Sequence, residues 1–429
     1  MSDAAMTESG KLGLKELIAI GVGGMIGGGI FSVLGMAVDI SGHAAPLAFV
    51  LGGLLAFIAG YSYVRLALTY HSDGASFTYL EIAFPEHPWI AAVTGWTVVI
   101  GYIGTIALYA FTFGAYGADL LGYSGSVVVR HILSVAVILL FLFVNLRGVT
   151  STGNIEDIIV YAKIVLLAIL ALAGTSAIDT ERFSPHIDHG LSSVFMAGAL
   201  IFVAYEGFQL ITNAVCESSQ PERNIPRAIY GSIGIVFLIY TLLAIVAVGT
   251  LDLEELIQAK EYSLAVAAGP MLGDWGTMLV DVAALLATTS AINATMFGAS
   301  RMMADMAIAH EMPSPFSFRN RVEVPWAAVC SIAILSLMFT LLGGGLELIA
   351  AFSSMTFLLV SAAVGIANFR LRRQTGANVL LVVLGVLLIV GTMTTLVVYL
   401  AGNNLPTLIW ITAIYLMIAV AETGFRRIA

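Results

Sequence analysis

GVGGMIGGGIF, residues 21–31, interrupts an apolar segment that runs from about residue 14 to residue 40. Six of the first nine residues in this stretch are glycines, and each glycine inside a helix costs about 1 kcal/mol relative to alanine. In hydrocarbon a break in a helix is tolerated only inside protein or beside a cavity, because the freed amides and carbonyls need partners. The stretch therefore predicts a discontinuous membrane helix, of the kind that places half-helix ends at a solute site.

A dinucleotide-binding loop and close helix packing are the alternatives to a solute site at these glycines. The loop needs glycines at offsets 0, 2 and 5, but counting from Gly21 the third position is Ile26, and counting from Gly27 it is Ser32. Close helix packing is the stronger alternative, because residues 23–27 match the Gly-x-x-x-Gly motif.

The composition places the chain in the membrane class. Of 429 residues, 59% are hydrophobic and 10% are charged, compared with about 25% charged residues in soluble proteins. A soluble protein of this length lacks the interior to hide so much apolar surface. The two cysteines, Cys216 and Cys330, lack metal-ligand spacing. We expect a lipid bilayer around the chain, and no metal, cofactor or nucleic-acid partner.

Apolar runs long enough to cross about 30 Å of hydrocarbon predict an all-α integral membrane protein with twelve transmembrane helices. Fourteen Lys and Arg residues fall in the loops and ends on one side of these runs, and three fall on the other side. The positive-inside rule then places both termini, including a tail at residues 1–11, in the cytoplasm, and we expect the plasma (inner) membrane. The runs lie near residues 14–40, 46–70, 89–121, 127–145, 155–174, 191–217, 226–250, 271–303, 325–343, 346–369, 378–401 and 405–425.

A second interruption lies in the sixth run, which reads FVAYEGFQ at residues 202–209. A carboxylate here, that of Glu206, should face a cavity, find a partner or be protonated. The break comes five helices after the first, and helices 1 and 6 cross the membrane in opposite senses. Matching breaks of this kind predict a 5+5 inverted repeat with discontinuous helices 1 and 6. The two repeats and the peripheral helices 11 and 12 are expected at residues 12–174, 191–372 and 378–425.

The two breaks together predict a site for a zwitterionic amino acid. Amides at residues 27–29 begin the second half of helix 1, where the positive end of the helix dipole favours a carboxylate. Carbonyls that end the first halves of helices 1 and 6 lack helical partners and suit an ammonium. Tyr205 and Phe208 would either close over the solute or serve only in packing. The expected substrate-binding residues are Met25, Gly27, Gly28, Gly29, Val203, Tyr205, Glu206 and Phe208.

Lys163 lies in helix 5, eight residues beyond Ile155 and so about 12 Å along the helix axis. Its ammonium either snorkels to the headgroups or is buried and exchanges a proton at working pH. In the second case the charged amine pins helices 1 and 8 together, and the neutral amine releases them. The expected proton-coupling residues are Lys163, Gly23, Gly24, Thr288, Thr289 and Ser290.

Three motifs in this order resemble the amino acid–polyamine–organocation (APC) transporter superfamily. They are GGMIGGGIF at residues 23–31, YEGF at 205–208 and ESSQPERNIPRA at 217–228, where Gln220 replaces a usual Asn. The resemblance spans about residues 12–425. It implies a five-plus-five inverted repeat with two peripheral helices, and alternating access by rocking of a bundle against a scaffold. Lys163 is similar to the helix-5 lysine of the family's proton-coupled amino acid symporters, where the ammonium occupies the position of a sodium ion in related carriers.

Glu206 departs from the family pattern, in which an apolar residue commonly precedes this glycine. The carboxylate would select cationic amino acids or polyamines, serve as a second protonation site, or point into a scaffold pocket. We therefore expect a secondary-active symporter that carries an amino acid with protons, and not an enzyme. An exchanger of the same fold and a facilitative channel are the alternatives, and gradient-driven net accumulation separates the symporter from both.

Overall fold

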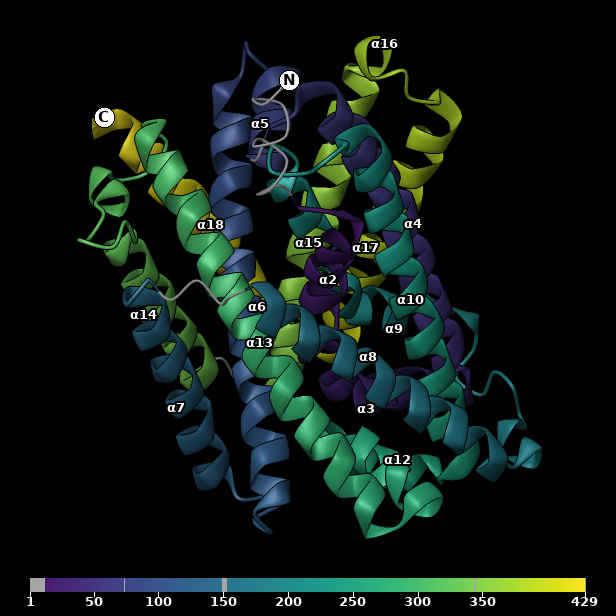
Figure 1. Ribbon diagram of the computed structural model, residues 1–429. Helices are drawn as coiled ribbons and strands as arrows, with labels where there is room; N and C mark the ends of the chain where they lie inside the picture. Colours follow the sequence, from purple (N-terminus) through teal and green to yellow (C-terminus); the bar gives the residue numbers. More distant parts are fainter. Residues whose placement is uncertain (1–11, 73, 149–152, 343–344, 429) are drawn as a thin grey trace, which may run out of the picture.

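The computed structural model describes residues 12–72, 74–148, 153–342 and 345–428. Helices make up the architecture, and within these ranges the only β-type pairing is an isolated bridge between Leu12 and Ser218. Figure 1 shows a helical bundle with α2 near its centre, α5 and α16 at one end, and α12 at the other. We call these the α5 end and the α12 end.

Two of the predicted spans are interrupted, and the others are continuous helices. The first consists of α2 (Leu14–Met25) and α3 (Gly29–Ser41), and the sixth of α9 (Leu191–Leu200) with the 3-10 segments η4 (Ile201–Tyr205) and η5 (Phe208–Ala214). The long helices are α4 (Ala45–Tyr70), α6 (Pro88–Leu120), α7 (Val127–Leu146), α8 (Gly153–Gly174), α10 (Pro221–Thr250), α13 (Asp274–Ile308), α14 (Trp326–Leu342), α15 (Leu346–Arg370), α17 (Val379–Asn403) and α18 (Leu405–Ile428). The connecting segments are η1 (Gly42–Ala44), α5 (Ala75–Ala83), η2 (Thr175–Ala177), η3 (Thr180–Phe183), α11 (Leu253–Ala259), η6 (Lys260–Tyr262), α12 (Ser263–Leu272), η7 (Ser314–Ser317) and α16 (Arg372–Thr375).

Ten helical stretches in the described ranges are long and apolar enough to cross a membrane. The sequence predicts twelve, and two features account for the difference. The predicted spans 14–40 and 46–70 share one stretch, Gly29–Tyr70, because η1 links α3 directly to α4. The predicted span 325–343 is α14, which has 17 residues and falls among the shorter apolar helices. The twelve crossings remain a prediction.

The interrupted segments occupy the centre of the bundle. Every residue from Gly21 to Gly35 and every residue from Ala197 to Gln209 is buried. Large apolar side chains are instead exposed along α7, α8, α17 and α18, among them Leu140, Ile169, Leu387 and Trp410. A membrane protein presents such a surface to lipid, whereas its irregular backbone must be enclosed by protein.

Small residues allow the helices around this centre to approach one another closely. A Cβ added at Gly101 of α6 would lie 2.7 Å from Thr356 of α15, and one added at Gly104 would lie 2.7 Å from the Ser353 hydroxyl. Glycines at helix crossings in membranes permit this kind of contact. They bring α6, which contacts the first interruption, close to α15, which contacts the second interruption.

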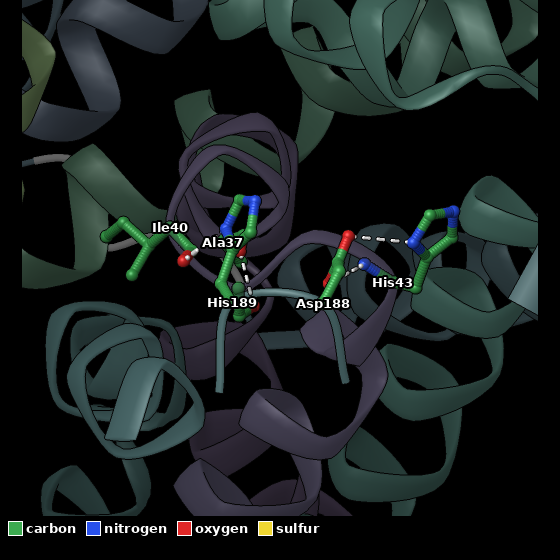
Figure 2. A network of polar contacts seen from close by, with 6 residues as sticks. Ala37, Ile40, His43, Asp188 and His189 are labelled. Atoms are coloured by element: carbon green, nitrogen blue, oxygen red, sulfur yellow. Dashed lines mark hydrogen bonds and ion pairs between the residues drawn. The ribbon is translucent and has the colours of Figure 1, made fainter. Parts of the chain in front are cut away.

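A short loop is tied to the end of α3, as Figure 2 shows. The Asp188 carboxylate accepts bonds from the His43 imidazole at 2.8 Å and from the His43 backbone amide at 3.2 Å, and His189 donates to the Ile40 carbonyl at 3.0 Å. Gly42 has φ +56°, and a Cβ there would lie 2.3 Å from the Asp188 oxygens. Only glycine therefore permits this contact.

This contact predicts a pH-dependent contribution to stability. Partial burial raises the pKa of Asp188 and the bonds from His43 lower it, with a net pKa below the usual aspartate value. A lowered folded-state pKa stabilises the protein above about pH 4 and loses that effect as pH falls through the lowered value. We expect Asp188→Asn to reduce stability by about 1 kcal/mol at neutral pH, and the difference from the wild type to shrink as pH falls below the usual aspartate pKa.

Thermal unfolding of the detergent-solubilised protein between pH 3 and pH 8 measures this difference. Glu181→Gln is the matched control, because Glu181 is exposed on the same loop and forms no side-chain bond to α3 among the contacts of the described residues. A pH-independent difference for Asp188→Asn would contradict the assignment.

Candidate transport site at the two interruptions

The break in the first span has the position that the glycines predict. The α2 helix ends at Met25, Ile26 has non-helical backbone angles (φ −82°, ψ 65°), and α3 begins at Gly29. The last carbonyls of any helix have no partner within the helix. Because this helix end is buried in the centre of the bundle, those carbonyls need bonds from other segments.

Two tyrosines bind the carbonyls at the end of α2. The Tyr109 hydroxyl of α6 donates to the Gly24 carbonyl at 3.1 Å, and the Tyr240 hydroxyl of α10 donates to the Met25 carbonyl at 2.8 Å. Both side chains are fully buried. The sequence predicts a substrate ammonium at Met25, and in this conformation a phenol occupies that acceptor. The sequence reasoning missed both tyrosines, although each is a polar aromatic residue within an apolar span.

Lys163 supplies the third of these bonds. Its ammonium donates to the Ile26 carbonyl at 2.8 Å and to the Ser290 hydroxyl of α13 at 2.9 Å, and the side chain is 1% exposed. The accepting carbonyl is that of Ile26, whereas the sequence predicts Gly23 or Gly24 as the acceptor. Thr288 and Thr289 donate to carbonyls of their own helix. The structure thus places Lys163 between α2 and α13, and its burial argues against snorkelling.

Glycines 27–29 lie against other parts of the bundle. A Cβ added at Gly27 or Gly28 would lie 2.7 Å from the Tyr109 ring, and one added at Gly29 would lie 2.7 Å from the Ala204 Cα. No larger residue fits at these positions. In this conformation the amides proposed to bind a carboxylate are covered by Tyr109 on one side and by η4 on the other.

The second break is irregular over a longer stretch than the first. After Leu200 the chain continues as 3-10 helix, and Gly207 has φ +130°, which favours glycine. Ser354 of α15 bridges the helix end, because its hydroxyl donates to the Leu200 carbonyl at 2.5 Å and accepts from the Val203 amide at 2.9 Å. No sequence pattern signals that this serine bridges the second break.

The side chains around the second break face the interior. The Tyr205 hydroxyl donates to the Phe49 carbonyl at 2.8 Å, and the Tyr205 ring packs against that of Tyr240 at 5.4 Å between centroids. Phe208 packs edge-on against Tyr63 at 5.5 Å. In this conformation both aromatics serve in packing.

Glu206 is 3% exposed, and its carboxylate accepts a hydrogen bond from Gln209. The phenols of Tyr63, Tyr102 and Tyr109 lie within its electrostatic range.

The two breaks touch through their backbones. A Cβ added at Gly207 would lie 2.5 Å from the carbonyl carbon of Gly24 and 2.6 Å from the Met25 nitrogen. A solute that binds both half-helix ends must therefore separate these peptide groups.

A cavity of about 650 Å³ reaches this contact from the α5 end. Gly24 and Leu210 line its inner part, Phe77 of α5 lines its wall, and Glu217 and Arg301 are exposed residues of its lining. On the other side of the break, α3 is buried from Gly29 to Gly35. The structure is thus accessible toward the α5 end and packed toward the α12 end.

Comparison with known proteins identifies the family. A sequence model described as amino acid permease matches residues 12–420. The chain belongs to the amino acid permease family. An uncharacterized protein of Methanocaldococcus jannaschii is 30% identical over 422 residues, covering 97% of this chain and 96% of that protein. The inner membrane transport protein YbaT of Escherichia coli is 29% identical over 418 residues, with the same coverage.

Two more proteins are similar to this chain: a relative whose name states its substrate class, and a solved structure with a similar fold. Cationic amino acid transporter 1 of Arabidopsis thaliana is 25% identical over 399 residues, covering 88% of this chain and 66% of that protein. A crystal structure of the Eremococcus coleocola manganese transporter superposes with a TM-score of 0.63 over 99% of this chain and 94% of that chain, at 12% identity. The latter shows the fold alone. This permease is therefore a multi-pass membrane transporter with an APC-type helical fold.

The Gly24–Gly207 contact predicts that Gly207→Ala is severe. The new methyl group must displace backbone atoms and also occupies a backbone conformation that disfavours L-residues, so we expect a loss of about 2 kcal/mol or more and loss of transport. Gly234→Ala in α10 is the control, because its Cβ would meet Phe57 at an ordinary 3.8 Å. Thermal unfolding and uptake in proteoliposomes measure both effects, and normal uptake by Gly207→Ala would refute the close contact.

Proposed function

We propose that this permease is a secondary-active, proton-coupled amino acid symporter of the plasma membrane that works by alternating access. The proposal includes twelve crossings, two inverted repeats at residues 12–174 and 191–372, peripheral helices at 378–425, and both termini in the cytoplasm. The family membership supports amino acid transport. With the α5 end in the cytoplasm, the 650 Å³ cavity is a cytoplasmic vestibule.

The observation that carries proton coupling is the position of Lys163. It is the buried cation that joins the broken end of α2 to α13. A charged amine forms hydrogen bonds roughly twice as strong as a neutral one. Loss of the proton therefore weakens both bonds at once and frees the Ile26 carbonyl and the end of α2. Protonation state and helix position are linked by this one side chain.

The substrate site in this proposal forms when the two breaks separate. The carboxylate of the amino acid replaces the Tyr109 ring at the amides of Gly27, Gly28 and Gly29. Its ammonium binds the carbonyls of Met25 and Val203. In this conformation those carbonyls accept hydrogen bonds from polar side chains or from the adjacent helical turn. Tyr205 and Phe208 close over the solute, and Glu206 meets the cationic end of the substrate.

Replacing Lys163 tests the coupling. We expect Lys163→Ala to lose pH-gradient-driven accumulation by at least tenfold while retaining exchange of labelled for unlabelled amino acid, because substrate contacts remain. Ser290→Ala keeps the ammonium but loses one of its bonds, and should shift the pH dependence of uptake with a smaller loss. Uptake by proteoliposomes with an imposed pH gradient measures both.

Two outcomes of this experiment decide against the proposal. Full gradient-driven accumulation by Lys163→Ala removes the proton switch. A wild-type protein that requires internal amino acid and shows no net uptake is an exchanger. Lys163→Arg is the matched control, since it keeps a cation that does not release its proton at any working pH, and we expect it to bind substrate without coupled accumulation.

We further propose cationic amino acids or polyamines as the substrate class, on two grounds. Relatives include cationic amino acid transporters of Arabidopsis thaliana, and Glu206 places a buried carboxyl group at the second interruption. A charge-assisted contact contributes about 1.5–3 kcal/mol, which is tenfold or more in affinity.

Glu206→Gln tests this assignment, because it keeps size and removes charge. We expect arginine and lysine uptake to fall at least tenfold while alanine uptake changes less than about twofold. Unchanged selectivity across neutral, acidic and cationic amino acids and polyamines would leave the carboxylate with a role in protonation or packing. Glu347→Gln in the first turn of α15 is the control for removal of an acid elsewhere.

A further inference from the structure

A second, smaller cavity of about 140 Å³ lies between the end of α7, the α13 helix and the segment that precedes α14. Two arginines line it, Arg301 of α13 and Arg319 of that segment. Arg301 and Phe297 also line the 650 Å³ cavity. Among the described residues that line the small cavity, none belongs to either interruption, so the cavity is separate from the proposed substrate site.

Hydrogen bonds hold Arg319 beside this cavity. The Asn320 side chain accepts from the Val322 amide at 3.0 Å and donates to the Leu146 carbonyl of α7 at 2.9 Å. The Arg319 guanidinium donates to the Glu323 carbonyl at 3.1 Å, and both residues are part of the lining. The segment before α14 is therefore tied to α7, and the guanidinium is tied to the segment.

Arg301 approaches the cavity from α13. Its guanidinium lies 3.4 Å from the centre of the Phe297 ring, one helical turn away. Within the described part of the chain, no carboxylate forms an ion pair with Arg301 or Arg319. Each guanidinium has five N–H donors, and the bond to Glu323 uses one donor of Arg319. Donors of both arginines thus remain available to a ligand.

The charges around Arg301 are of both signs. Arg319 lies within its electrostatic range, as do Glu217 and Asp305, which line the large cavity. Glu323 is the acid in the lining of the small cavity. Two like charges that line one cavity repel each other, and an anion between them converts this repulsion into attraction.

The surroundings of the small cavity are apolar and exposed. Figure 1 shows α7 and α14 next to each other at the edge of the bundle, and the two helices are in contact. Beside the cavity, Val322, Trp326 of α14 and Phe143 of α7 are about half exposed. Tryptophan is enriched where a membrane protein meets the lipid headgroups. The cavity therefore combines a cationic lining with a rim that suits lipid.

We propose that Arg301 and Arg319 bind the phosphate of an anionic phospholipid, whose acyl chains lie along the exposed faces of α7 and α14. The planar guanidinium matches the geometry of phosphate oxygens, and basic pockets between membrane helices on the cytoplasmic side bind anionic headgroups. A zwitterionic lipid brings an ammonium to the same pair of arginines, so a headgroup with net negative charge is favoured. The leaflet follows from the cytoplasmic position of the α5 end proposed above.

The bound lipid joins α13 to the segment before α14. The same α13 helix carries Ser290, which accepts the bond from Lys163, and Arg301 forms part of the wall of the large cavity. The lipid thus stabilises one position of this wall, and transport depends on the lipid composition of the membrane.

Thermal unfolding of the purified, delipidated wild-type protein in detergent at pH 7.5 tests the proposal. Phosphatidylglycerol is titrated, with phosphatidylcholine and inorganic phosphate as comparisons at equal ionic strength. A ligand that binds only the folded state raises the unfolding temperature as it saturates the site. We expect a saturable rise of several degrees with phosphatidylglycerol, and a rise less than half as large with phosphatidylcholine or phosphate.

Four variants locate the effect. Arg301→Gln and Arg319→Gln should each raise the half-saturating concentration of phosphatidylglycerol about tenfold, because each loses a charge-assisted contact with phosphate. Glu323→Gln removes an acid from the lining and should lower that concentration. Arg321→Gln is the matched control, since Arg321 is exposed on the same segment and lies outside the described lining. If Arg301→Gln does not fold, the exposed Arg319 carries the test.

Several results overturn the proposal. These are equal stabilisation by phosphatidylglycerol and phosphatidylcholine, the same response in Arg319→Gln and Arg321→Gln, or weaker binding by Glu323→Gln. The full effect with inorganic phosphate would assign a free anion to the site instead of a lipid. Lys163→Ala should keep the response to phosphatidylglycerol, so failure of proton coupling and failure of this site are distinguishable.

Discussion

The structure depends on how the buried end of α2 satisfies its backbone carbonyls. Three successive carbonyls, those of Gly24, Met25 and Ile26, accept hydrogen bonds from side chains of three different helices. Because this helix end is buried in the bundle, the break persists only while α6, α8 and α10 supply donors to its carbonyls. The same bonds fix these helices relative to α2. A change at any one of them is therefore communicated to the broken end.

The two breaks differ in the side-chain groups that bind their free backbone groups. Around the first, two phenols and one ammonium donate, and the ammonium is the one donor that can lose its charge. Around the second, Ser354 both accepts and donates across the gap between Leu200 and Val203. The donors at the first break thus include a titratable ammonium, whereas the bonds of Ser354 at the second join neutral groups. Backbone contact between Gly24 and Gly207 then makes the position of one break depend on the other.

Charges are sparse in this protein, and their placement is informative. Lys163, Glu206 and Asp281 are each nearly fully buried, yet they have different surroundings. Within the described residues, Lys163 donates to the Ile26 carbonyl and the Ser290 hydroxyl, Glu206 accepts from the Gln209 amide, and one Asp281 oxygen has no partner. The first two lie at the interruptions, whereas the third lies in α13, away from both.

The sequence by itself determined the membrane class and the places of both interruptions, and it singled out Lys163 as a lysine within an apolar run. These follow from local chemistry: glycines destabilise a helix wherever it lies, and a lysine within an apolar run needs a partner. Only the tertiary structure decided which groups meet. Tyr109 and Tyr240 are far from residues 24–25 in the sequence, and no spacing rule predicts that their phenols reach those carbonyls. The acceptor for Lys163 is Ile26 rather than Gly23 or Gly24, because the rotation of α8 against α2 sets which carbonyl its ammonium reaches. The contact of Gly24 with Gly207 likewise depends on helix rotation and depth. Those are set by side-chain packing over the whole bundle, which a local pattern does not encode.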